Sequence, residues 1–140
     1  MKAILLSVRP QWCYEMENGR KTIEARKTFP VQLSEPFKCY IYMSSGFVPH
    51  DSKLFSKCGS VVAEFVCDKI FYLLQNDHVY EGTLPQTALT REQLRKYGAG
   101  KTVYGWHISF LQIYDKALDL SRFGLDRPPQ SWCYVEDVSA

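Results

Sequence analysis

The sequence has few of the features that mark membrane, secreted or disordered proteins. None of its apolar runs reaches the ~18–20 residues that a membrane helix requires. The apolar stretch before Pro10 is short and carries little charge, so we expect no signal peptide. Hydrophobic residues make up 46% and charged residues 23% of the chain, close to the averages of folded proteins, so extensive disorder is excluded as well. We therefore expect a cytoplasmic protein with one domain over residues 1–140.

The cysteines are odd in number and widely spaced. The chain has five cysteines, an odd number, and no Cys-x-x-Cys or His-x-x-x-His pair that would give a common zinc spacing. Without a signal peptide, this pattern does not favour disulfides. We predict reduced, buried cysteines, and neither a metal nor a cofactor. The alternative is a metal site built from distant cysteines together with His107.

Basic residues outnumber acidic residues only slightly. The net charge of +2 is lower than that of many nucleic-acid-binding proteins. The charge is unevenly placed, because the first 27 residues carry six Lys and Arg against three Glu. The other 113 residues carry the remaining 11 basic and 12 acidic residues. The distribution favours a small basic site in the first fifth of the chain and argues against sequence-independent binding of long duplex DNA.

Hydrophobic patterning predicts about five strands with short helices between them. The first strand covers residues 3–9, and Pro10 suits the first turn of a helix that ends at Asn18-Gly19. Thr90 begins a second helix, because Gln93 completes the spacing of a capping box. The other strands are expected over the ranges 20–27, 37–44, 60–74 and 102–114.

The last of these strands contains Trp106 and His107. Alternation places the two side chains on opposite faces, and the pattern leaves open which of them faces the core and which a cleft. Long strands with few helices predict an α+β fold. We expect a small, mostly antiparallel β-barrel of about five to six strands with two or three short helices.

The most informative segment is GRKTIEARK, which begins at Gly19. In a strand, Thr22, Glu24 and Arg26 would share one face, with Lys21 on the other. A hydroxyl, a carboxylate and a guanidinium in one row make a poor core face, because each buried polar group needs a partner. The row fits either a polar cleft or a solvated strand face with a weak ion pair.

Three segments together resemble the ASCH family, whose small domains are similar to the PUA-like RNA-binding fold. They are LLSVRP at residues 5–10, GRKTIEAR at residues 19–26 and PPQSWCYV at residues 128–135. The second resembles the family signature G-x-K-T-x-E-x-R. Many members continue after this strand with a short G-D step, whereas this chain has TFPVQ at residues 28–32. That turn must therefore be built differently here.

The resemblance implies a PUA-like barrel with a cleft beside the signature strand, which binds RNA or a nucleotide-like ligand. Carried over by position, the ligand-binding residues are Ser7, Arg9, Lys21, Thr22, Glu24, Arg26, Gln130, Ser131 and Trp132. Basic members of this set would meet phosphate, and its carboxylate and amide would meet a base edge. Trp132, Trp106 or Tyr42 could stack on an unpaired base, but the alternating apolar strand around Trp106 favours the core for that ring.

The resemblance leaves functions of different classes open. One is an RNA- or nucleotide-binding domain whose polar cleft holds a single base or a short single strand. Another is an amidohydrolase that removes acyl groups from modified cytidine-type nucleosides. Small relatives of that kind use a second threonine in the signature as nucleophile, and here Glu24 stands in its place. Lys21 and Glu24 would then be catalytic, with Glu24 acting as general base toward water. A third possibility is a protein-interaction domain that uses its aromatic residues.

Overall fold

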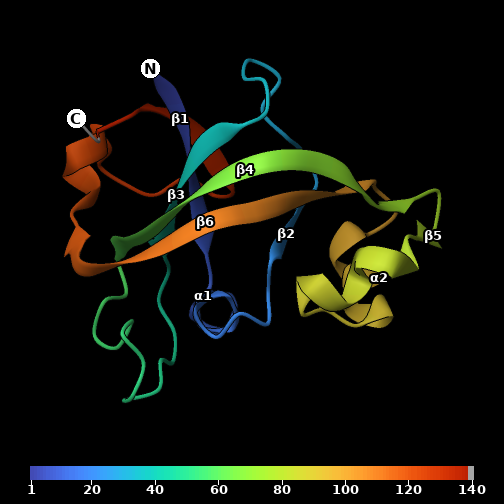
Figure 1. Cartoon of the computed structure of the whole chain (residues 1–140), viewed down its shortest axis with the longest axis horizontal. Helices are drawn as coiled ribbons and strands as arrows, with labels where there is room; N and C mark the ends of the chain where they lie inside the picture. Colours follow the sequence, from blue (N-terminus) through green and yellow to red (C-terminus); the bar gives the residue numbers. More distant parts are fainter. Residues whose placement is uncertain (139–140) are drawn as a thin grey trace.

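The computed structural model describes residues 1–138 of the chain. The described part forms seven strands and four helical segments. In chain order these are β1 (Lys2–Val8), α1 (Pro10–Glu17), β2 (Ile23–Arg26), β3 (Phe37–Met43), β4 (Ser60–Gln75), β5 (His78–Val79), η1 (Glu81–Thr87), α2 (Arg91–Gly98), β6 (Val103–Leu118), η2 (Leu120–Phe123) and β7 (Trp132–Glu136). The two longest strands, β4 and β6, run side by side across the whole molecule (Figure 1).

The strands form one mixed sheet in the order β2-β6-β4-β3-β1-β7, with β5 paired to β4. Only β1 and β3 run parallel, so the expected mostly antiparallel sheet is confirmed. The expected closed barrel is not confirmed. The strands β2 and β7 are the two edges of the sheet, and no strand pairing joins them within residues 1–138. The strand count also exceeds the expected five to six, since β5 and β7 form in segments that carried no clear strand pattern.

The short length of β2 explains why strand pairing does not close the sheet. The expected strand over residues 20–27 is reduced to four residues. Before it, the amides of Arg20 and Lys21 both donate to the carbonyl of Glu15, at 3.0 and 3.1 Å. The amide of Thr22 donates to the carbonyl of Gln86 at 2.9 Å. These backbone groups are already satisfied by α1 and η1 and cannot extend a strand toward β7.

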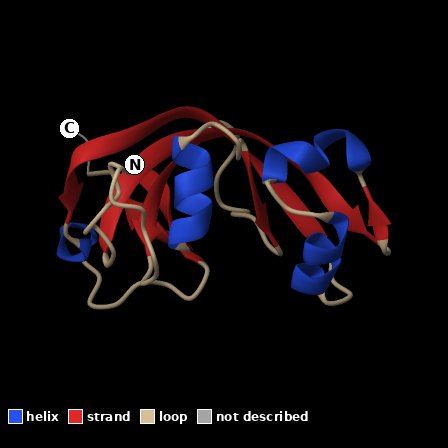
Figure 2. Cartoon of the chain, turned by 90° about the horizontal axis from the view of Figure 1, so that it is seen from below, coloured by secondary structure: helices blue, strands red, loops and turns tan. Residues whose placement is uncertain are grey.

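In Figure 2 the strands arch across the top of the view and the helices lie below them. Side chains from opposite faces of β6 pack against the two helices, since Trp106 belongs to the cluster with α1 and Val103 to the cluster with α2. The core beneath α1 contains Cys13 from that helix and the fully buried Trp106. A separate core beneath α2 is built around Leu94, Leu73 and Val103. Trp106 therefore fills the core. His107 lies on the opposite face, where its Nδ1 is 2.7 Å from Asp68 Oδ1.

The predicted helix ends are confirmed, because they depend on local contacts. Pro10 occupies the first turn of α1, and Gly19 follows that helix with a φ of +76°, which glycine adopts without strain. At α2, the amide of Gln93 donates to Thr90 Oγ1 at 3.1 Å, and the amide of Thr90 donates to Gln93 Oε1 at 2.8 Å. This reciprocal pair is the predicted capping box.

The five cysteines are all free, but they are not all buried as predicted. Three are buried, and burial raises the pKa of the Cys67 thiol to about 12. Cys58 is exposed and Cys133 is half-buried, because they lie in a loop and in the edge strand β7. Within residues 1–138, no group of three or more His, Cys, Asp or Glu side chains could hold a metal ion.

Gly105 marks a place where β6 is in close contact with its neighbours. A Cβ atom there would lie 2.9 Å from Phe71 Cε2, 3.0 Å from Ile23 Cγ2 and 3.1 Å from Leu73 Cδ2. We expect Gly105→Ala to lower the free energy of unfolding by about 1–3 kcal/mol in urea titrations, because the added methyl overpacks the core beneath α2. Gly82→Ala is the control, since no atom lies within 4 Å of its Cβ position. Equal midpoints for both variants would contradict this reasoning.

Candidate ligand-binding site

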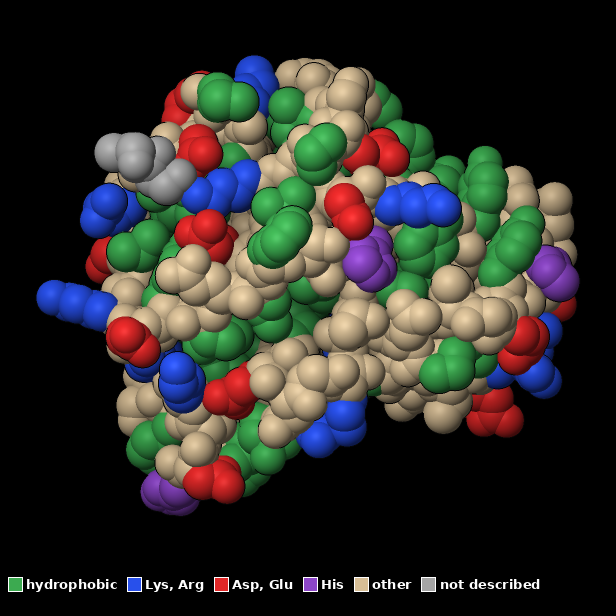
Figure 3. All heavy atoms as spheres, in the orientation of Figure 1, with side chains coloured by type: hydrophobic (Ala, Val, Ile, Leu, Met, Phe, Trp, Pro, Cys, Tyr) green, Lys and Arg blue, Asp and Glu red, His purple; other side chains and the backbone are tan. Residues whose placement is uncertain are grey.

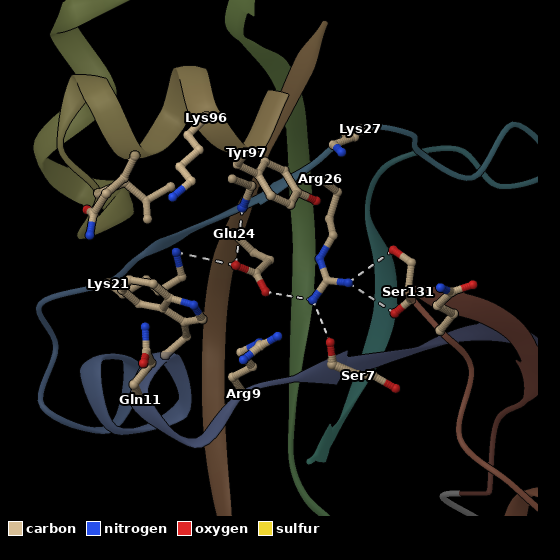
Figure 4. Close-up of a pocket in the computed structure, with 15 residues that line it drawn as sticks. Ser7, Arg9, Gln11, Lys21, Glu24, Arg26, Lys27, Lys96, Tyr97 and Ser131 are labelled. Atoms are coloured by element: carbon tan, nitrogen blue, oxygen red, sulfur yellow. Dashed lines mark hydrogen bonds and ion pairs between the residues drawn. The ribbon is translucent and has the colours of Figure 1, made fainter. Parts of the chain in front are cut away.

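A cavity of about 840 Å³ lies beside β2, between α1 and α2. Figure 4 shows side chains from β1, β2, α1 and α2 converging on it, with residues that precede β7 at one side. Its lining residues are Ser7, Arg9, Gln11, Trp12, Lys21, Glu24, Ala25, Arg26, Lys27, Leu89, Gln93, Lys96, Tyr97, Gln130 and Ser131. The volume is within the range of pockets that hold small ligands.

The centre of the cavity is a buried carboxylate between two cations. Lys21 Nζ lies 3.3 Å from Glu24 Oε1, and Arg26 Nη2 lies 2.9 Å from Glu24 Oε2. Lys21, Glu24 and Arg26 are only 2%, 4% and 8% exposed. The expected alternation fails at Lys21, because this residue precedes β2 and its side chain turns toward Glu24. Thr22 instead donates from Oγ1 to Gln86 Oε1 at 3.3 Å.

Arg26 joins the two sides of the sheet that strand pairing leaves apart. Its Nη1 donates to the carbonyl and the hydroxyl of Ser131, at 3.0 and 3.1 Å. Its Nη2 donates to the carbonyl of Ser7 at 2.7 Å and to Glu24 at 2.9 Å. We call these four contacts the Arg26 bridge. Because a guanidinium has five N–H donors, the bridge leaves Arg26 little capacity for a phosphate.

Lys21 is held from three directions. Its Nζ donates to the carbonyl of Thr87 at 2.6 Å, pairs with Glu24 and lies 5.2 Å from the ring centroid of Trp12. The lysine therefore ties η1 and α1 to β2 around one ammonium group. Within this arrangement, Lys21 stabilises the floor of the cavity more than it offers a free donor to a ligand.

The two cations keep Glu24 ionised. Burial raises the pKa of the Glu24 carboxyl, but the charges of Lys21 and Arg26, with a hydrogen bond from Arg26, outweigh burial and hold it below its ordinary value. A general base works best when its pKa is near the working pH, so this carboxylate is a weak base near neutrality.

The lowered pKa of Glu24 makes the free energy of unfolding depend on pH in the acid range. A glutamate in the unfolded chain has a pKa near 4.5. The Glu24 carboxylate therefore binds a proton more weakly in the folded protein than in the unfolded chain. The stabilisation that the ionised Glu24 contributes to the folded protein is complete above the pKa of the unfolded chain. It is lost as the pH falls through the pKa of the folded protein. We expect the stability difference between wild type and Glu24→Gln to narrow below pH 4.5 in urea titrations. If the stability difference between the two proteins stayed constant from pH 7 to pH 3, this prediction would be wrong.

The side chains at the rim of the cavity have the donors and rings that can contact a ligand. Arg9 and Lys96 are exposed, and Lys27 is half-buried with its Nζ 4.9 Å from the ring centroid of Tyr97. Three glutamines and the rings of Trp12 and Tyr97 also line the cavity. The cavity thus has five basic side chains against one carboxylate.

The sequence matches no family model and no curated protein. Solved structures do match. A variant of the ASCH protein of Zymomonas mobilis has a TM-score of 0.74 at 17% identity, over 97% of this chain and 91% of that one. The unmodified protein gives 0.71 at 18% identity, over 96% of this chain and 87% of that one. The chain has the ASCH fold.

The ASCH fold brings together seven of the nine residues expected to bind ligand. These are Ser7, Arg9, Lys21, Glu24, Arg26, Gln130 and Ser131. Thr22 and Trp132 do not line the cavity. The indole of Trp132 donates from Nε1 to Thr28 Oγ1 at 2.9 Å and packs edge-on against Trp106, with centroids 5.9 Å apart. Tyr42 is also elsewhere, in the cluster around Tyr40.

Sequence reasoning missed the contribution of α2 to the cavity. Gln93, Lys96 and Tyr97 come from this helix, about 70 positions after β2. Nothing in the local pattern of residues 91–98 distinguishes them from an ordinary solvated helix face. The only usable signal is amphipathicity, because Leu94 is the side chain that α2 buries and its neighbours must point away from the core.

No helix within residues 1–138 is both long and apolar enough to cross a membrane.

Proposed function

We propose that this domain is a member of the ASCH family that binds RNA or a nucleotide, with a single base or a short single strand in the cavity. The observation that carries the proposal is the set of groups around one cavity: five basic side chains, three glutamines, two aromatic rings and a single carboxylate. A nucleotide offers the complement of this set, with an anionic phosphate, a flat base and an edge of donors and acceptors. The signature at residues 19–26 supports the family assignment.

The contacts suggest a division of roles between rim and floor. Arg9, Lys27 and Lys96 at the rim have donors for phosphate. The rings of Trp12 and Tyr97 suit stacking on an unpaired base, which contributes about 1–3 kcal/mol per base. The floor, made by the Glu24 ion pairs and the Arg26 bridge, fixes the positions from which these rim groups act.

The same contacts give less support to the amidohydrolase hypothesis. Glu24 is a weak base because of its lowered pKa, and the Lys21 ammonium is already bonded to Thr87 and Glu24. The hydroxyl of Thr22 contacts Gln86 and does not line the cavity. We therefore expect acylated cytidine to raise the melting temperature without release of its acyl group. Acyl release above the rate of the uncatalysed reaction would favour the hydrolase.

Removing a rim cation should weaken binding in a salt-dependent way. We expect Lys96→Ala to reduce affinity for a short single-stranded RNA roughly threefold to tenfold at low salt, since one phosphate contact is lost. The slope of log K against log salt should fall by about 0.7, the value for one contact to a single strand. Fluorescence titrations at several salt concentrations measure both quantities.

Lys101→Ala is the matched control, because it removes the same charge from an exposed residue outside the cavity. Its affinity and salt slope should equal those of the wild type. If neither RNA nor nucleotide binds the wild type at low salt, the proposed function is wrong. Equal losses in the two variants would show that only overall charge matters.

A further inference from the structure

A row of four aromatic rings crosses the sheet next to the cavity. It runs from Phe29, just after β2, to Tyr104 on β6, Tyr72 on β4 and Tyr80 just after β5. Successive ring centroids are 4.8, 5.6 and 6.2 Å apart. We call this row the aromatic stripe.

The stripe lies on the side of the sheet that α2 does not cover. Tyr72 and Tyr104 are cross-strand partners and therefore share a face. Their chain neighbours Leu73 and Val103 point to the other face, into the core beneath α2. In Figure 3, hydrophobic side chains reach the surface over this end of β4 and β6, near β5.

Three of the four rings are accessible to a partner, whereas Tyr104 between them is half-buried and packs against the core beneath α1. Tyr72 is 45% exposed, and Phe29 and Tyr80 are each 38% exposed. The hydroxyl of Tyr80 donates to Gln75 Oε1 at 3.1 Å, so this ring is also held in place. Adjacent exposed rings of this kind on one surface mark a binding site more often than isolated ones do.

The stripe is continuous with the cavity. Arg26 lines the cavity and is the cross-strand partner of Tyr104, so the stripe begins one strand from the cavity wall. Lys27 also lines the cavity, two residues before Phe29, and provides a cation at the junction. A chain that left the cavity at this point would meet the rings directly.

We propose that the aromatic stripe continues the RNA site, and that bases of a single strand leaving the cavity stack on its rings. This inference rests on the proposed function. Single-strand binders combine cations that follow the backbone with rings on which successive bases stack, which is the arrangement here. A protein partner fits less well, because a stable interface buries about 800 Å² per partner and one row of partly exposed rings offers far less.

The test compares oligouridylates of two and eight nucleotides, since only the longer one can occupy both cavity and stripe. Wild type should bind the octamer more tightly at low salt. Tyr72→Ala should weaken octamer binding roughly tenfold and leave dinucleotide binding unchanged, which also shows that the variant is folded. Tyr72→Phe should keep wild-type affinity, because the ring face remains. Phe110→Ala is the control, since Phe110 is 86% exposed on the same sheet but outside the stripe.

The outcomes separate the two proposals. If neither oligonucleotide binds, the proposed function fails and the stripe inference falls with it. If both bind the wild type equally, or if Tyr72→Ala binds the octamer like the wild type, the cavity function stands and the stripe inference is wrong. A different result would assign the stripe to protein contacts. In that case the wild type would sediment as a dimer, whereas Tyr72→Ala would sediment as a monomer and bind the octamer as tightly as the wild type.

Discussion

Replacing Glu24 by glutamine is expected to lower the free energy of unfolding by about 3–5 kcal/mol. The substitution removes the only carboxylate of the cavity, which pairs with Lys21 at 3.3 Å and with Arg26 at 2.9 Å. Both cations are almost fully buried, so the variant leaves two like charges close together without a counter-charge. Because little of either cation contacts solvent, the penalty for the missing counter-charge exceeds the worth of the lost hydrogen bonds. Urea unfolding at pH 7 measures the loss.

Glu81→Gln is the matched control for this prediction. Glu81 forms a shorter ion pair, 2.7 Å from Arg91, but both side chains are more than half exposed. Solvent screens the pair, so the same change of glutamate to glutamine should have little effect there. Similar losses in the two variants would mean that burial of the Glu24 cluster contributes nothing special, and the account of the cavity floor would have to be abandoned.

Replacing Arg26 by lysine is expected to lower the free energy of unfolding by about 3 kcal/mol, although the charge is retained. A lysine can still pair with Glu24. It cannot reach Ser7 and Ser131 at the same time, because it lacks the planar fork of the guanidinium. The two carbonyls that accept from Arg26 at 2.7 and 3.0 Å would lose their side-chain donors. Affinity for ligand should fall as well, since Gln130 and Ser131 are no longer fixed against β2.

Arg91→Lys serves as the control for the Arg26 variant, because its guanidinium contacts an exposed carboxylate only. Urea titration and RNA binding should both remain close to wild type. If Arg26→Lys were as stable as wild type, the Arg26 bridge would not be what holds the β2 edge to the residues before β7.

The parts of the fold that depend on neighbouring residues could be predicted from the sequence. Pro10, Gly19 and the Thr90–Gln93 pair each set a helix end through contacts within a few positions, and all are confirmed. The alternation correctly placed Trp106 and His107 on opposite faces of the strand, although it did not decide which of them faces the core. Such signals are readable because the interacting groups are close in the chain.

The parts that depend on distant residues could not be predicted. Lys21 faces Glu24 because the start of β2 is set by bonds to Glu15 and Gln86, which no pattern within residues 20–27 contains. The glutamine, lysine and tyrosine of α2 reach the cavity only because the long β4–β6 pair returns the chain to β2. The sequence predicts a barrel closed by strand pairing, whereas side-chain contacts span the gap, from Arg26 to Ser131 and from Trp132 to Thr28.

The Arg26 bridge also has a consequence for the order of folding. Its contact with Ser131 joins positions 105 residues apart, and its contact with Ser7 joins the first strand to the same point. Contacts so distant in sequence form only after the intervening chain has been ordered, because closing the long loop costs entropy first. During synthesis, the residues of β1 and β2 are therefore made long before Ser131, which completes the bridge. The cavity therefore cannot be complete before Gln130 and Ser131 have been synthesised.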